Sequence, residues 1–135
     1  MKKSAVFLAL IGMTMLMGGL PSFAQTSYNF HAPSAFYAGN AKMPAGTYTI
    51  RQSQDDPQMW ELSNSSGSHS VLLEARQSSK ASKGKPEVLF NKYGGTDYLE
   101  GVETSSGDSI DIQVSAAEKM AAKKGTATPH TVPTA

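Results

Sequence analysis

The side chains best suited to chemistry in this sequence are three histidines, His31, His69 and His130. Imidazole serves as a general base and as a metal ligand, but no Cys, Asp or Glu accompanies these histidines at the spacing of a metal site. His31 and His69 lie in or beside stretches that read as strands, so they could meet across a sheet with a carboxylate between them. We favour two surface histidines, and predict neither metal nor cofactor.

A serine beside a histidine occurs once in a catalytic-looking context, in Gly67-Ser68-His69-Ser70. Nucleophilic catalysis needs the two side chains to hydrogen-bond, whereas neighbouring strand residues point to opposite faces. The sequence contains no Gly-x-Ser-x-Gly elbow and no phosphate-binding glycine loop. Asp55 and Asp56 precede Pro57, which favours a turn over a cation site. We therefore predict no catalytic residue, and a hydrolase is the least favoured function.

A lysine-rich stretch over residues 78–86 is the strongest candidate for a binding surface. The cations of this stretch and its flanks are Arg76, Lys80, Lys83, Lys85 and Lys92. Together they would form a local positive patch suited to anionic lipid headgroups, polysaccharide or nucleic acid. The alternative, which we favour, is a solvated loop whose lysines keep strand edges from pairing with other chains.

The elements that must position these residues are strands, because apolar and polar residues alternate with period 2. About seven segments show a strand pattern: residues 27–31, 47–51, 59–63, 70–75, 87–91, 97–104 and 109–114. The aromatic residues on their inward phase are Tyr28, Phe30, Tyr48, Trp60 and Phe90. An inward phase predicts a core rather than an aromatic ligand platform.

Gly94-Gly95 is the sharpest turn signal, because a two-residue hairpin turn needs positive φ angles. The resulting register pairs Tyr93 with Thr96, Lys92 with Asp97 as an ion pair, and Phe90 with Leu99. Gly101 then marks a bulge that lets Leu99 and Val102 share one face despite their odd spacing.

The C-terminal part changes to a helical pattern. Ser115-Ala116-Ala117-Glu118 is a capping box, which predicts a helix over residues 116–124 that stops at Gly125. Residues 126–135 contain little apolar surface, so we expect a disordered tail.

The N-terminal 24 residues have the three parts of a secretion signal. Lys2 and Lys3 precede an apolar run over residues 5–20, and Ser22-Phe23-Ala24 supplies small residues for cleavage before Gln25. A permanent membrane anchor is disfavoured because the run is shorter than the ~20 apolar residues of a spanning helix. The chain has no cysteine, so a lipid-modified N-terminus and disulfides are both excluded.

The remaining length, residues 25–125 with the tail, fits one domain. Without Lys2 and Lys3, 10 of the 12 basic residues stand against 11 acidic ones, a net charge of −1. A nearly neutral domain has no overall attraction for nucleic acid, which we do not expect as a partner.

The sequence also resembles a family of small secreted β proteins of Gram-negative soil bacteria. The resemblance rests on three motifs, Phe36-Tyr37-Ala38-Gly39, Met43-Pro44-Ala45-Gly46-Thr47-Tyr48-Thr49-Ile50 and Val88-Leu89-Phe90-Asn91-Lys92-Tyr93-Gly94. It continues at Tyr98-Leu99 and at the capping box of Ser115 to Glu118. Met43 stands where the family usually has leucine, and Glu103 where an aromatic is common. The resemblance implies export and a β fold, and it implies no activity.

These observations predict an all-β domain: a small antiparallel meander, closed as a barrel or rolled as a sandwich, with a short C-terminal helix. The favoured function is an exported, non-enzymatic binding or structural module of the cell envelope, periplasmic or extracellular. Its partner would be an envelope protein or an anionic polysaccharide or lipid surface. The alternative is a lipocalin-like carrier of an apolar ligand. Strands of six residues span only ~20 Å, so the aromatics should fill so small a barrel.

Overall fold

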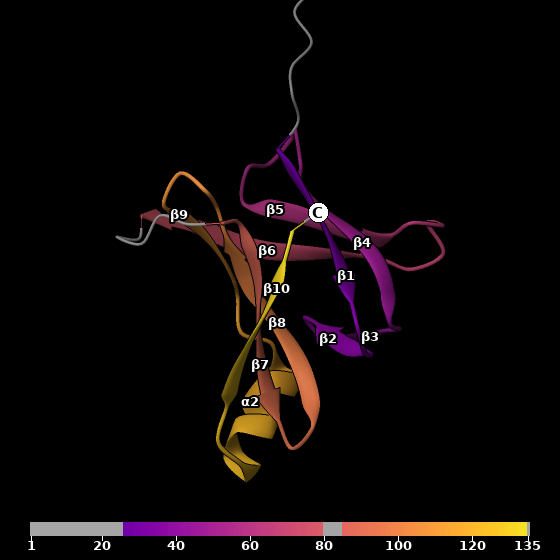
Figure 1. Cartoon of the computed structure of the whole chain (residues 1–135), viewed down its shortest axis with the longest axis vertical. Helices are drawn as coiled ribbons and strands as arrows, with labels where there is room; N and C mark the ends of the chain where they lie inside the picture. The colour runs from indigo at the N-terminus through magenta and orange to yellow at the C-terminus, as the bar shows by residue number, and fades with distance from the viewer. Residues whose placement is uncertain (1–25, 80–84, 135) are drawn as a thin grey trace, which may run out of the picture.

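The computed structural model describes residues 26–79 and 85–134, and it is mostly β-sheet (Figure 1). The strands are β1 (Ser27–Ala32), β2 (Phe36–Ala38), β3 (Ala41–Met43), β4 (Gly46–Gln52), β5 (Met59–Asn64), β6 (Ser70–Ser79), β7 (Glu87–Tyr93), β8 (Thr96–Glu103), β9 (Asp108–Ile112) and β10 (Thr128–Pro133). One helix, α2 (Ala116–Lys124), lies between β9 and β10. The all-β class is confirmed, but the described residues form ten strands, because the period-2 pattern does not reveal β2, β3 and β10.

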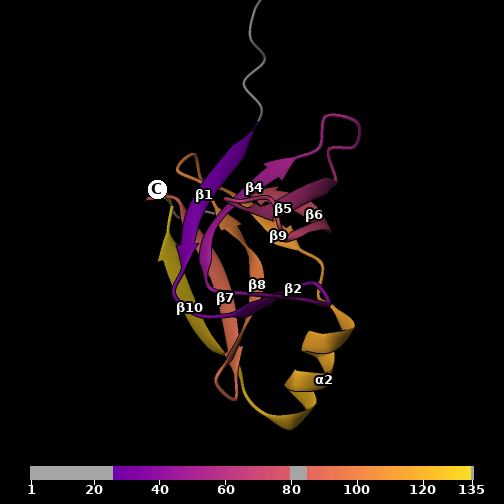
Figure 2. The ribbon, with the colours of Figure 1, turned by 90° about the vertical axis from the view of Figure 1, so that its right-hand side faces the viewer.

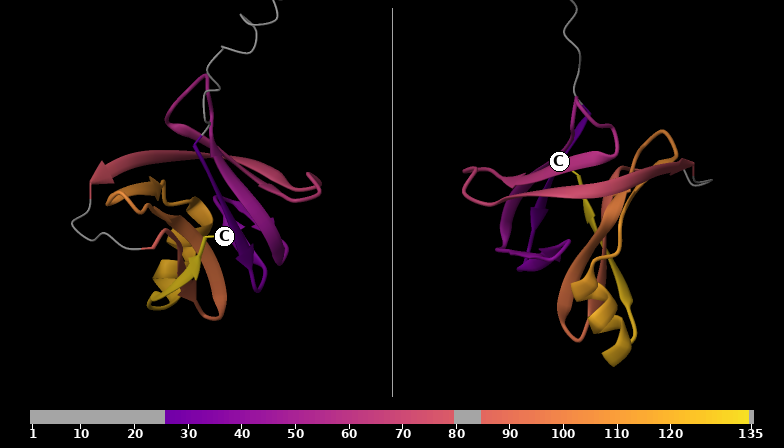
Figure 3. Two further views of the ribbon diagram at one scale, coloured as in Figure 1. Left: turned by 45° about the horizontal axis from the view of Figure 1, so that its top comes forward. Right: turned by 180° about the vertical axis from the view of Figure 1, so that it is seen from behind.

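The strands form one mixed sheet in the order β1-β4-β5-β6-β9-β8-β2-β3, with β7 between β8 and β10. A simple meander is therefore wrong. The ten-residue β6 pairs with β5 through its first half and with β9 through its second half. Figure 3 shows β6 running from one half of the sheet to the other. β2 lies parallel to β8, and the other pairings are antiparallel.

The closed-barrel alternative is also wrong. Thr134, the residue after β10, makes an isolated bridge to Phe30 of β1, and the contact does not extend into a ladder. Figure 2 shows the resulting curved, open sheet, with α2 at its lower end beside β7 and β8. The two ends of the sheet approach each other because they cover the same apolar core.

The core is filled by side chains from both halves of the sheet. Four aromatic rings, of Phe30, Phe36, Tyr48 and Phe90, pack with centroids 5.1 to 6.2 Å apart. Trp60 is fully buried, as its phase predicts. Tyr28, on the same predicted phase, is only half-buried at the edge of the core.

The Gly94-Gly95 hairpin forms as the sequence predicts. Both glycines have positive φ, 54° and 86°, and the pairs Tyr93/Thr96 and Phe90/Leu99 are in register. The register then shifts between Leu89 and Phe90, so Glu100 is the extra residue of a bulge. Leu99 and Val102 are both buried in consequence.

The C-terminal segment corrects one expectation. Thr128–Pro133 is strand β10, paired with β7, and not a disordered tail. Low apolar content did not exclude a strand, because β7 offers a whole edge of backbone partners and Val132 is buried against the core. Before β10, helix α2 begins with the Ser115 Oγ accepting a hydrogen bond from the Glu118 N–H at 3.1 Å. The expected signal segment lies outside the described residues.

Candidate functional site

Three of the five cations expected to form a basic patch, Arg76, Lys85 and Lys92, lie in the described part of the chain. Arg76 is exposed on β6, Lys85 is exposed before β7, and Lys92 lies near the opposite end of β7. Lys85 and Lys92 are seven positions apart along an extended chain, about 23 Å at ~3.3 Å per residue. Lys80 and Lys83 lie outside the described residues. Lys92 therefore does not belong to a surface with Lys85.

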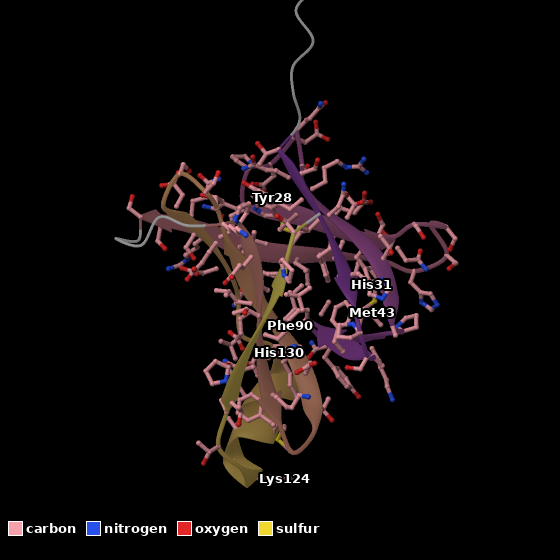
Figure 4. The ribbon with its side chains drawn as sticks, in the orientation of Figure 1. Tyr28, His31, Met43, Phe90, Lys124 and His130 are labelled. Carbon is pink, nitrogen blue, oxygen red and sulfur yellow. The ribbon has the colours of Figure 1, made fainter. Side chains whose placement is uncertain are left out.

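Asp97 lies beside a different side chain from the one expected. Lys92 and Asp97 are opposite each other in the hairpin, but within the described residues no ion pair joins them. The Asp97 carboxylate is buried, with its Oδ2 atom 3.5 Å from Nδ1 of His130. β10 brings His130 there, with its ring 5.8 Å from that of Phe90 (Figure 4). The sequence prediction missed this pair because it placed His130 in a tail.

The remaining histidines do not meet. His31 on β1 lies opposite Thr47, and its Nδ1 is 3.3 Å from the Thr47 Oγ1. His69 lies in the turn before β6, so β4 and β5 separate it from β1. No group of three His, Cys, Asp or Glu side chains in the described part of the chain could hold a metal ion.

The serine and aspartate candidates have local partners. The Ser68 Oγ accepts a hydrogen bond from the Asn64 Nδ2 at 2.9 Å, within the β5–β6 turn. The Asp56 Oδ1 accepts one from the Gln58 N–H at 3.0 Å. Both arrangements stabilise turns.

A surface groove of about 650 Å³ lies beside the first half of β6. It is bounded by the β2–β3 turn and by the segment that leads from β9 into α2. The residues that line it form three runs, 39–41, 71–74 and 112–116. Leu72 and Val114, which are 63% and 44% exposed, are the large apolar side chains in it that face solvent.

One edge of β6 is unpaired along this groove. The Ala75 N–H bonds to the Gln58 carbonyl of the β5 side, so the alternation of an antiparallel ladder turns the Leu72 N–H and C=O away from β5. On that other side β9 pairs with β6 only from Ala75 onward, and the last bond runs from the Gln113 N–H to the Glu74 carbonyl. Residues 70–73 thus have no strand partner on this edge among the described residues.

A cluster of glutamate and tyrosine side chains lies between α2 and the outer face of β7 and β8. Glu118 is 5% exposed, and its Oε2 accepts a hydrogen bond from the Tyr93 hydroxyl at 3.4 Å. The bulge places Glu100 beneath the same helix residue, and the buried Glu100 Oε1 has no hydrogen-bond partner among the described residues. The Tyr98 ring packs beside the Tyr93 ring, with the two centroids 5.6 Å apart.

This environment favours a protonated carboxyl. Burial, and then the neighbouring Glu100, raise the pKa of Glu118 to about 8. Burial also raises the pKa of Tyr93 and of Tyr98, and the Glu118 charge adds to both shifts. A neutral Glu118 carboxyl can donate a hydrogen bond to Glu100. The sequence identified Glu118 only as a capping residue, and the bulge at Glu100 was the available signal that a second carboxylate would face it.

Neither the helices of the structure nor comparisons with known proteins indicate a further site. In the part of the chain that the structure describes, no helix has the length and apolar character to cross a membrane. A scan against protein-family models finds no match, and searches of curated proteins and of solved structures find no similar protein.

Proposed function

We propose that the protein is an exported, non-enzymatic module of the cell envelope that binds an extended segment of a partner protein along β6. The observation that carries this proposal is the unpaired edge of residues 70–73 at the base of the groove. Free backbone N–H and C=O groups on a strand edge are satisfied by another strand, which is the basis of recognition by β-strand addition.

The dimensions of the edge set the length of the segment. Four residues of strand extend about 13 Å at ~3.3 Å each, so a bound segment would pair through about four residues. Its alternate side chains would point toward the groove, where Leu72 and Val114 offer apolar contacts. We therefore expect a peptide with apolar residues at every second position.

The packed interior counts against a lipocalin-like carrier. A carrier needs an empty, apolar cavity inside the sheet, whereas the rings of Phe30, Phe36, Tyr48 and Phe90 occupy that space. The separation of Lys85 from Lys92 likewise counts against one anionic docking surface that includes both lysines. A partner protein at the β6 edge is the occupant that the geometry favours.

The test uses a displayed library of random heptapeptides selected against the purified protein. Peptides that bind are synthesised, their affinities are measured by calorimetry, and amide shifts locate the contact. We expect the largest shifts within residues 70–73 and 113–115. Binding confined to another surface contradicts the proposal.

Two variants make the test specific for backbone pairing. Leu72→Pro removes the N–H that faces the groove while leaving the bonds to β5, and proline is tolerated on such an edge. It should weaken binding at least tenfold, whereas Leu72→Ala, which keeps the N–H, should weaken it less. Met120→Glu, on an exposed apolar residue of α2 outside the groove lining, is the control and should bind as wild type. Equal affinity of a folded Leu72→Pro variant and wild type rules out strand addition at this edge.

A further inference from the structure

We infer that Glu118 and Glu100 share one proton, and that this proton holds α2 against the sheet, so that the helix is released in alkaline conditions. The inference concerns the C-terminal half of the molecule and does not depend on the peptide groove. It rests on the geometry of two carboxyl groups that no cation neutralises in the described structure.

The first step is the orphaned oxygen of Glu100. The Oε1 atom is buried and has no hydrogen-bond donor among the described residues, and an unsatisfied buried carboxylate oxygen is costly. Glu118 is the neighbouring group that can satisfy it, but only by carrying a proton. The Tyr93 hydroxyl already donates to the other side of the pair, at Oε2 of Glu118. A single proton therefore completes the hydrogen bonding.

The second step concerns the other groups around the pair. β8 contributes Glu100 and Tyr98, and β7 contributes Tyr93 and the neutral Asn91. Burial raises the pKa of both tyrosines above their usual value near 10, so they remain neutral through the range of interest. The three lysines of α2, at positions 119, 123 and 124, are exposed, and no ion pair joins them to Glu118 among the described residues. Asp111 of β9 and His130 of β10 line a surface hollow together with Glu100. The pKa that burial and Glu100 raise into the range between pH 5 and pH 9 is that of Glu118.

The third step is the sign of the effect. Docking raises the pKa of Glu118 from 4.5 to about 8, so the docked state holds a proton that a released helix gives up. The contribution to docking is complete below the ordinary glutamate pKa and declines as pH rises toward 8. Linkage of one proton makes the docking constant fall about tenfold per pH unit over this range. Above pH 8 the ionised Glu118 carboxylate is buried with no cation beside it among the described residues, which is costly.

Apart from the Glu118 contact, few interactions hold α2 against the sheet. The Asn40 Oδ1 accepts a hydrogen bond from the Ala117 N–H at 3.1 Å, and Glu118 is the one buried residue of the nine in α2. Met120 on its outer side is exposed. Loss of the Glu118 contact therefore removes the principal anchor of the helix.

The experiment measures hydrogen exchange of α2 amides in the full chain between pH 5 and pH 9, corrected for intrinsic base catalysis. The opening constant of α2 should rise about tenfold per pH unit up to pH 8, while β4 amides, far from the pair, should not follow. A carboxyl-carbon NMR titration should place Glu118 well above the ordinary glutamate range. A native Glu118 that titrates near 4.5, or β4 opening in step with α2, overturns the inference.

Substitutions separate the proton from simple packing. Glu118→Gln keeps a side chain that can donate to Glu100 and still serves the capping box, so α2 opening should become independent of pH. Glu74→Gln, an exposed glutamate outside the cluster, should retain the wild-type dependence. Should Glu118→Gln fail to fold, Glu100→Gln provides the second test, because loss of the neighbouring charge should lower the Glu118 pKa. Unchanged pH dependence in either folded variant overturns the shared proton.

Discussion

Gly101 of β8 lies against the backbone of Ile110 in β9 so closely that a Cβ atom on Gly101 would overlap the Ile110 carbonyl oxygen. This contact occurs at the bulge, where β8 changes partner from β2 to β9. The absence of a side chain allows the two strands to stay paired while the extra residue, Glu100, turns toward α2. One glycine thus links the packing of the sheet to the carboxyl pair.

The substitution Gly101→Ala should destabilise the protein by about 3 kcal/mol, because a backbone oxygen cannot give way as a flexible side chain can. Gly125→Ala is the matched control, since nothing lies within 4 Å of the added atom and its φ of −170° suits any residue. Urea unfolding measures both. Equal stability of the two variants would contradict the close approach.

The hairpin turn supports a second prediction. Gly94 and Gly95 both have positive φ and open space around them, so any cost of substitution comes from backbone strain. Replacing both with valine should lower the free energy of unfolding by about 2 kcal/mol or more. Gly94→Asn should be nearly neutral, because Asn-Gly suits the same turn. If Gly94→Asn is as unstable as the double valine variant, the turn type is wrong.

Trp60 supports a third prediction. It is fully buried, and its indole Nε1 has no hydrogen-bond partner among the described residues. Trp60→Ala should cost about 3–5 kcal/mol through the cavity it leaves. Trp60→Phe should cost far less. It removes the unpaired indole N–H, and burying such a donor lowers stability by about 1–3 kcal/mol, which offsets part of the lost packing. Native tryptophan emission should be blue-shifted and resist quenching by iodide, and a red-shifted, quenchable emission would place the ring elsewhere.

Export supports a fourth prediction. The Lys2-Lys3 pair, the apolar run and Ser22-Phe23-Ala24 predict that secreted protein begins at or within a residue or two of Gln25. Mass analysis of the N-terminal peptide from periplasmic and culture fractions checks this. Intact Met1 in a membrane pellet would show that the segment is retained.

Sequence patterns succeeded where the determinants are local. The Gly94-Gly95 turn and the Ser115 cap each lie within a few residues, and the buried phase of Trp60 repeats every second residue. The same patterns could not find β2 and β3, because three residues are too short for an alternation to show. The order of the strands depends on β6 changing partners midway, which no local pattern records.

The candidate sites were less predictable than the fold. The β6 edge exists because β9 leaves the sheet at Gln113, and the carboxyl pair exists because α2 folds back over the bulge. Both juxtapositions join residues distant in sequence. A capping glutamate and a glycine-marked bulge were visible separately, but their meeting depends on tertiary structure.

The C-terminal strand shows how proline can be accommodated at a sheet edge. Pro129 and Pro133 are four residues apart, so they present their missing N–H groups on the same side of β10. The Thr134 N–H bonds to the Pro86 carbonyl on the β7 side. By alternation, the prolines therefore face the outer edge, where no ladder needs a donor.

This arrangement predicts an alternating pattern of amide exchange in a segment whose composition indicates disorder. The amides of His130, Val132 and Thr134 should exchange slowly, because they point toward β7, while the amide of Thr131 should exchange fast. Val132→Ala should cost about 2 kcal/mol from lost burial, and Thr131→Ala, on the exposed face, should change stability by less than about 0.5 kcal/mol. Uniformly fast exchange across these residues, with both alanine variants as stable as wild type, would mean that the segment is a free tail and that His130 does not reach Asp97.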